Sequence, residues 1–293
     1  MTARRFLAIA GMLVLTAPAA GAQSWRTFTA QRALGREDSL RVVVSYGLGK
    51  FLLRAAEPAA LYSIDMRYDA DVFRVEKTYD AASHTLRVGA DSATAVRFNL
   101  SAKNFRGSNS HGRAESGTMT LYLARGVPLD LTVQLGIATA DLDFGELWVD
   151  RAKIEAAMGA AAISFPAPNV HPMRELIVDA AFGGLSIDHL GNARARHVRI
   201  EAALGGGEID LRGEWTGEMT IEVSSVLGGF NISAPTDVGV RVNSTMRLAG
   251  MGLKGFTKRG DAYYSPNYDA AKRKVIIIAV ATLGGYDVRW VAP

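Results

Sequence analysis

Apolar and polar residues alternate along the second half of the chain in short runs that repeat around a glycine. Six segments share this form, and their leading glycines are Gly136, Gly159, Gly183, Gly205, Gly228 and Gly284. Strict alternation of apolar and polar residues is typical of a strand with one buried and one solvated face. The pattern therefore predicts, in each segment, two short strands that are joined at the glycine.

Apolar residues recur at fixed distances from the leading glycine: five before it, one before it and four after it. The column one residue before the glycine consists of Leu135, Met158, Phe182, Leu204, Leu227 and Leu283. In the segment around Gly159, the other two positions are Ile154 and Ile163. We expect all three columns to point inward and to stack as ladders with about 4.8 Å between rungs.

The repeat has a nearly constant period. The first five glycines are 23, 24, 22 and 23 residues apart, and a degenerate copy, MRLAGMGL, places Gly250 another 22 residues on. Such a period is typical of a solenoid, in which each coil buries its apolar face only against its neighbours. We predict an all-β fold: a β-solenoid (a single-stranded β-helix) of about seven coils, in which glycine provides the sharp turn between faces.

The chain before these repeats is predicted to form a small all-β N-terminal region. Residues 40–53, LRVVVSYGLGKFLL, resemble one more coil with Gly47 in the glycine position, and residues 95–100 form a further strand. The polar stretch at 106–117 is interpreted as an exposed loop. We divide the chain into a signal peptide at 1–22, an N-terminal β region at 23–105, a linker loop and strand at 106–126, and the solenoid at 127–293.

The first residues have the pattern of a secretory signal peptide. Arg4 and Arg5 precede an apolar run from Phe6 to Leu15, and small residues follow up to Ala22. A run of ten residues is too short to cross a membrane, which takes about 20. We expect cleavage after Ala22, export to the periplasm or the cell exterior, and a mature chain without a transmembrane segment.

Composition excludes several classes of function. Two of the 33 basic residues lie in the predicted signal peptide, which leaves 31 against 29 acidic residues, so no basic stripe for nucleic acid is expected. The chain has no cysteine, and therefore neither a disulfide nor a thiolate ligand. The five histidines form no HExxH motif, and GxSxG and GxxxxGK[ST] motifs are absent. We predict no enzyme activity and no cofactor.

Acidic residues also fall into columns on the predicted outer face. Glu155, Asp179 and Glu201 share one column, and Asp141, Asp188 and Asp210 share another, five residues past the glycine. Carboxylates one rung apart could hold Ca²⁺ or serve as the acid and base of a carbohydrate-active β-helix enzyme. Lys153 and Arg199 lie two residues before Glu155 and Glu201, and this compensation favours a solvated outer face.

An insertion at residues 256–274 precedes the last glycine segment. It contains three tyrosines among basic residues: Tyr263, Tyr264 and Tyr268, with Lys258 and Arg259 close by. Such a cluster suits a partner surface. The competing interpretation, which we favour, is a hairpin that covers the exposed end of the solenoid.

Several phrases together carry a resemblance to known proteins. They include VPLDLTVQLGIATADLDF (127–144), FPAPN (165–169), LGNA (190–193), GFTKRGDAYYSPNY (255–268) and LGGYDVRW (283–290). With these phrases, the chain resembles the LiaF-like and toast-rack domain families of bacterial envelope proteins. The resemblance implies a single-stranded β-helix with no known active site. It also implies a link to the cell-envelope stress response, because LiaF restrains an envelope stress kinase, although LiaF has membrane helices that are not predicted here.

These observations predict an exported, non-enzymatic binding or scaffold module of the cell envelope. Its partner would be an envelope protein or polymer and not a nucleic acid. The alternative is a β-helix carbohydrate-active enzyme that uses the acidic columns. A third hypothesis is a purely structural adhesin-like module.

Overall fold

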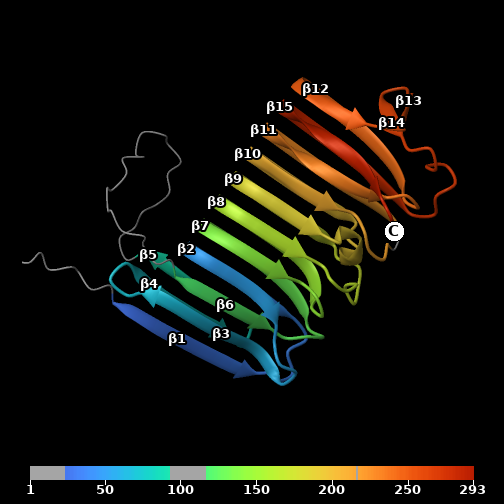
Figure 1. Cartoon of the computed structure of the whole chain (residues 1–293). Helices are drawn as coiled ribbons and strands as arrows, with labels where there is room; N and C mark the ends of the chain where they lie inside the picture. The colour runs from blue at the N-terminus through green and yellow to red at the C-terminus, as the bar shows by residue number, and fades with distance from the viewer. Residues whose placement is uncertain (1–23, 93–116, 216) are drawn as a thin grey trace, which may run out of the picture.

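The computed structural model of the chain describes residues 24–92, 117–215 and 217–293 (Figure 1). The predicted signal peptide at 1–22, the predicted strand at 95–100 and nearly all of the predicted loop at 106–117 lie outside these ranges.

The described residues form one long mixed sheet, which confirms the all-β prediction. The N-terminal strands are β1 (Trp25–Ala33), β2 (Leu40–Ala55), β3 (Ala60–Asp69), β4 (Phe73–Asp80), β5 (Thr85–Ser92) and β6 (Thr118–Leu123). The long strands that follow are β7 (Pro128–Asp143), β8 (Trp148–Ser164), β9 (Glu175–Asp188), β10 (His197–Asp210), β11 (Glu218–Pro235), β12 (Gly239–Leu253) and β15 (Lys274–Val291). A short hairpin of β13 (Thr257–Arg259) and β14 (Ala262–Tyr264) and a 3-10 turn, η1 (Leu190–Ala193), complete the fold.

Eight strands form a parallel ladder in the order β2-β7-β8-β9-β10-β11-β15-β12 (Figure 1). The last strand of the chain, β15, is inserted between β11 and β12, so the rungs do not follow chain order throughout. Hydrophobicity explains the exchange. Residues 274–281 of β15 read KVIIIAVA, whereas the residues of β12 that pair with them, 239–246, read GVRVNSTM. The more apolar strand takes the interior rung, where both of its edges are paired.

The register between strands corrects three glycine assignments. The glycines with positive φ at the bend are Gly49, Gly159, Gly183, Gly205, Gly228 and Gly284, with φ between 125° and 138°. In β2 the bend is at Gly49 and not at Gly47; in β7 Ala138, not Gly136, pairs with Gly159; and in β12 Ala249, not Gly250, pairs with Gly284. The prediction shifted these rungs because Gly47, Gly136 and Gly250, from which it counted, lie one or two residues from the bend.

The bend divides each ladder strand into two parts, which we call the first limb and the second limb, and we call the bend itself the corner. Both limbs bury one face. In β8, Ile154 on the first limb and Ile163 on the second are fully buried, as predicted. In β15 the last buried residue of the first limb is Ala281 and the first of the second limb is Tyr286. This interval is odd, so the alternation of inward and outward residues changes phase at the corner.

Short connections between the ladder strands are held by buried asparagines. Asn169, in the FPAPN phrase, donates to the carbonyl oxygen of Val149 at 2.6 Å and accepts from its amide at 3.0 Å. Asn192, in the LGNA phrase, donates to the carbonyl oxygen of Phe165 at 2.8 Å. These phrases therefore satisfy backbone groups that the loops would otherwise bury without partners.

The N-terminal strands pair with both limbs of the first rung of the ladder. Residues 41–46 of β2 pair with β5, and residues 50–55 pair with β6. Beyond these lie β4, which pairs with β5, and β3 and β1, which extend the sheet from β6. The strand β6 lies in the segment 106–126, which was predicted to hold a linker loop and a strand, and it is an integral strand of the sheet.

Candidate functional site

A line of apolar side chains runs along the corner of the parallel ladder; six of them are exposed, and Leu48 and Met158 are half-buried. Neighbouring strands pair these residues rung by rung, and we call them the corner ladder: Leu48, Ile137, Met158, Phe182, Leu204, Leu227, Leu283 and Leu248. At about 4.8 Å per rung, the line is about 34 Å long. Contiguous exposed apolar surface of this kind is typical of a contact site.

The prediction that the column one residue before the glycine points inward was wrong for Phe182, Leu204, Leu227 and Leu283, whereas Leu135 is buried because the bend of β7 lies farther on, at Ala138. The exposed fractions are 37% for Phe182, 36% for Leu204 and 49% for Leu227. The phase change at the corner is the reason, because the residue before the positive-φ glycine lies at the bend itself, where no opposite strand covers it. The odd interval between the apolar residues on either side of the corner is the sequence signal that could have revealed this exposure.

A groove of about 720 Å³ runs beside the corner ladder, across the first limbs near the bend. Its width comes from paired alanines on three successive rungs: Ala156 and Ala157, Ala180 and Ala181, and Ala202 and Ala203. Larger side chains at these positions would fill the space. Its polar residues include Gln134, Glu155, Asp179, Glu201 and Ser224.

The three predicted acidic residues lie on adjacent rungs of this groove. Glu155 is paired with Lys153 at 2.5 Å and accepts a hydrogen bond from Gln134 at 2.8 Å. These contacts, first that of Lys153, lower the pKa of Glu155. Glu201 forms an ion pair with Arg199. Two of the three charges are thus compensated, as the positions of the basic residues predicted.

Asp179 lies between these two pairs and differs from them. Its Oδ1 atom is buried and accepts no hydrogen bond within the described residues. Burial, followed by the nearby charge of Glu201, raises the pKa of Asp179. Among the residues that the structure describes, no group of three acidic or histidine side chains converges closely enough to hold a metal ion. The cation ladder predicted at Glu155, Asp179 and Glu201 stays a prediction.

The second acidic column is not continuous. Asp143, and not Asp141, lies on the rung line that leads through Ser164 to Asp188. Asp141 is instead paired with Arg54 at 2.6 Å. The prediction that Asp141 shares this column was wrong, because it used Gly136 as the reference glycine.

The predicted hairpin residues cluster at the outer edge of β12. Tyr263 and Tyr264 pair with Val242 and Arg241 of that strand. The tyrosines are half-buried and already in contact with cations: the guanidinium carbon of Arg259 lies 5.2 Å from the ring centre of Tyr264. Capping of the ladder end, which we favoured, thus accounts for the tyrosines on one limb of β12.

The remaining hairpin residues are engaged in the same way. Lys258 Nζ lies 5.7 Å from the ring centre of Tyr263, and Lys274 Nζ lies 5.0 Å from that of Tyr268. Burial raises the pKa of the Tyr268 hydroxyl. Lys258 and Arg259 are exposed, and Arg259 also forms an ion pair with Asp269 at 2.8 Å.

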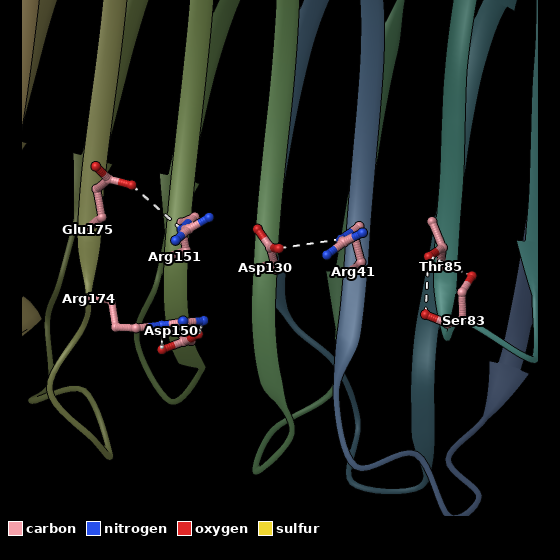
Figure 2. Close-up of polar contacts among 8 residues, drawn as sticks. All are labelled: Arg41, Ser83, Thr85, Asp130, Asp150, Arg151, Arg174 and Glu175. Carbon is pink, nitrogen blue, oxygen red and sulfur yellow. Dashed lines mark hydrogen bonds and ion pairs between the residues drawn. The ribbon is translucent and has the colours of Figure 1, made fainter.

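Charges at the start of the ladder strands are compensated in pairs between neighbouring strands (Figure 2). Arg41 lies 3.4 Å from Asp130, Arg151 lies 3.6 Å from Glu175, and Arg174 pairs with Asp150. Exposed pairs of this kind each contribute about 0–1 kcal/mol. The charges within these three pairs cancel. The corner ladder with its groove is the candidate site.

Comparisons with known proteins identify no family. No family model matches the chain, and no curated protein sequence matches it. Among solved structures, a candidate cell adhesion protein from Clostridium sporogenes has a TM-score of 0.43 at 11% identity and covers 91% of this chain and 100% of its own. A candidate adhesin from Bacteroides fragilis has a TM-score of 0.41 at 11% identity over 90% of this chain and 97% of its own.

A candidate lipid-binding protein from Parabacteroides distasonis has a TM-score of 0.27 at 9% identity and covers 91% of this chain and 97% of its own. All three scores lie below 0.5, so no function is transferred from these proteins. Over the described ranges, no helix is both long and apolar enough to span a membrane.

Proposed function

We propose that this chain is an exported, non-enzymatic binding module of the cell envelope, and that the corner ladder with its groove contacts the partner. The observation that carries this proposal is an uninterrupted apolar column on eight neighbouring strands, in which six of the eight side chains are exposed. The N-terminal pattern of a signal peptide supports export. The resemblance to envelope domain families supports the location and extends the proposal to a role in the envelope stress response.

We further infer that each bent strand and its connection make one coil of a β-solenoid. The strand β7 has 16 residues and would be about 53 Å long if it were straight. Only residues 144–147 connect it to β8, and they can span at most about 17 Å. The two ends of β7 must therefore approach each other, which supports a coil bent at the corner. Figure 2 agrees, since further ribbon segments lie behind the first limbs.

The chemistry of the site suits an elongated partner with apolar and basic side chains. Apolar groups would lie along the corner ladder, and a basic group would reach Asp179, whose charge has no close cationic partner of its own within the described groove. A segment of an envelope protein fits this description better than a neutral glycan. The partner would lie across the strands, because both the corner ladder and the groove run in that direction.

Capture from envelope extracts tests the proposal. We compare the wild-type protein with a Leu204→Gln/Leu227→Gln variant of the corner ladder and with Tyr263→Ala/Tyr264→Ala. We expect the first variant to lose capture and the second to retain it. Val170→Gln is a matched control, because Val170 is 54% exposed and lies outside the corner ladder. Equal capture by all the variants would refute the assignment of the site.

The carbohydrate-active alternative rests on Asp179, whose raised pKa and unpartnered oxygen would suit a general acid. Incubation of the protein with envelope glycans, with and without Ca²⁺, tests it. We expect no release of sugars by wild type. Release that is abolished by Asp179→Asn would contradict the binding proposal and establish the enzyme.

A further inference from the structure

The two ends of the parallel ladder are finished differently. At the N-terminal end, β5 and β6 pair with both limbs of β2. At the other end, β14 pairs only with residues 241–243 of β12. No described strand pairs with the outer edge of residues 244–253. A bare strand edge of this kind presents unpaired backbone groups to any extended chain.

The apolar interior is also open at this end. Met246, Met251 and Leu253 of β12 are partly exposed. Their neighbours on the preceding rung, Ala281, Tyr286 and Val288, are exposed by only 1%, 3% and 2%. A cleft of about 560 Å³ lies among Ser244, Met246, Met251, Leu253 and Tyr263. One more rung would bury these side chains as β12 buries those of β15.

Glycine 250 supports the addition of such a rung. It belongs to a column with Gly206, Gly229 and Gly285. A Cβ atom on these three would lie 1.9, 1.7 and 2.5 Å from a carbonyl oxygen of the next rung. A Cβ on Gly250 would meet nothing within 4 Å, as is also true of Gly184, farther back in the same column. Within the described residues, Gly250 therefore has no steric need to be glycine, whereas at Gly206, Gly229 and Gly285 the next rung creates one.

The free edge is symmetric in a way that fits a second copy of itself. Its bounds, 244 and 253, are equidistant from the corner between Leu248 and Ala249. The two inward methionines, Met246 and Met251, are also equidistant from this point. The phase change at the corner produces this symmetry, because it puts the inward residues of both limbs at equal distances from the centre.

We infer that two copies of this chain associate through residues 244–253 of β12, which pair antiparallel about a two-fold axis at the corner. Met246 of one copy then lies opposite Met251 of the other, and Arg247 lies opposite Gly250, where the missing side chain leaves room. Every inward residue faces an inward residue, so the two apolar interiors become continuous. The chain turns away after Leu253, where the amide of Phe256 donates to its carbonyl oxygen at 3.3 Å, which leaves space for the hairpin of the other copy.

The uneven ends determine the size of the assembly. Among the described strands of the parallel ladder, β2 is paired on both limbs by β5 and β6, whereas β12 has a free edge, and a two-fold contact through that edge closes at two copies. Leu248 of each copy lies beside the axis, so the two corner ladders form one line of twice the length. The inference stands without the proposed function, since it concerns a different surface.

Sedimentation equilibrium of the purified full-length protein tests the inference. We expect a mass of two chains for wild type at micromolar concentration and a mass of one chain for Gly250→Arg. The substituted side chain enters open space, so the melting temperature of the monomer should match that of wild type at low concentration. Gly184→Arg is the matched control, because Gly184 lies in the same glycine column, also has open space, and is far from the edge. A wild-type monomer, or a dimer that Gly250→Arg leaves intact, would overturn the inference.

A pair of introduced cysteines tests the register, since the chain has no cysteine of its own. Positions 247 and 250 of one strand are about 10 Å apart, beyond disulfide reach, whereas directly opposite residues of an antiparallel pair lie about 4.5–5.5 Å apart. Under mild oxidation, Arg247→Cys/Gly250→Cys should form a covalent dimer in high yield. Each single variant should form at least tenfold less. Equal crosslinking of a single variant would exclude this register.

Discussion

The buried columns and the corner ladder use the same types of residue in the same repeat, yet they have opposite roles. Ile200 and Leu204 lie four positions apart on β10, and their exposed fractions are 0% and 36%. The difference comes from the corner, where the positive-φ glycine changes the phase of the alternation. Hydrophobicity alone therefore does not distinguish a core position from a contact position in this fold; the distance from the bend does.

The largest effect is expected at the corner glycine that sets this contrast. A Cβ on Gly183 would lie 1.5 Å from the carbonyl oxygen of Gly159, and its φ of 138° is unfavourable for other residues. We expect Gly183→Ala to lower the free energy of unfolding by more than about 4 kcal/mol. Denaturant unfolding would measure it, with Gly184→Ala, where a Cβ meets nothing, as the control. Equal stability of the two variants would show that the corner is not under this constraint.

The second prediction compares a residue of a buried column with a residue of the corner ladder on the same strand. We expect Ile200→Ala to lower the free energy of unfolding by about 2–5 kcal/mol, because it leaves a cavity between rungs. Leu204→Ala, on the same strand, should change it by less than about 1 kcal/mol, since the side chain is substantially exposed. Thermal and denaturant unfolding of both variants would measure the difference. Similar losses at both positions would contradict the exposure of the corner ladder.

The smallest effect concerns Asp179 in the groove. Burial raises the pKa of this carboxyl in the folded protein, so the ionised form is destabilising, and stability falls as pH rises through the unfolded and then the folded pKa. Asp179→Asn should therefore be more stable than wild type at pH 7, by less than about 1 kcal/mol, because much of the side chain is solvated. The difference should vanish at a pH below about 4, where the carboxyl is protonated also in the unfolded chain. Glu155→Gln, which removes a paired carboxylate of lowered pKa, should show the opposite sign.

Much of the fold could be predicted from short-range patterns. The alternation around Ile154 and Ile163 predicted inward residues on both limbs, and the period of the glycines predicted parallel rungs. The hairpin at the C-terminal end was predicted from its position in the chain. These features depend on residues a few positions apart or on a regular spacing, which one sequence displays directly.

Errors arose where the pattern was ambiguous by one or two residues. Gly47 and Gly49, Gly136 and Ala138, and Ala249 and Gly250 are close alternatives for one rung position, and only the hydrogen-bonded register chooses between them. The column of Glu155, Asp179 and Glu201 was placed correctly because, in its three strands, the leading glycine is the one at the bend. Asp141 was misplaced because β7 has its corner at an alanine.

The residues themselves specify a repetitive β structure, because alternation and turn-forming glycines act locally on the backbone. Three features depended on the folded molecule. The strand β15 lies between β11 and β12, because this interior position pairs both edges of the more apolar strand. The corner residues face solvent, since the bend has no opposite strand. The edge of β12 is bare and self-complementary, since its symmetry becomes visible only when both limbs are placed around one corner.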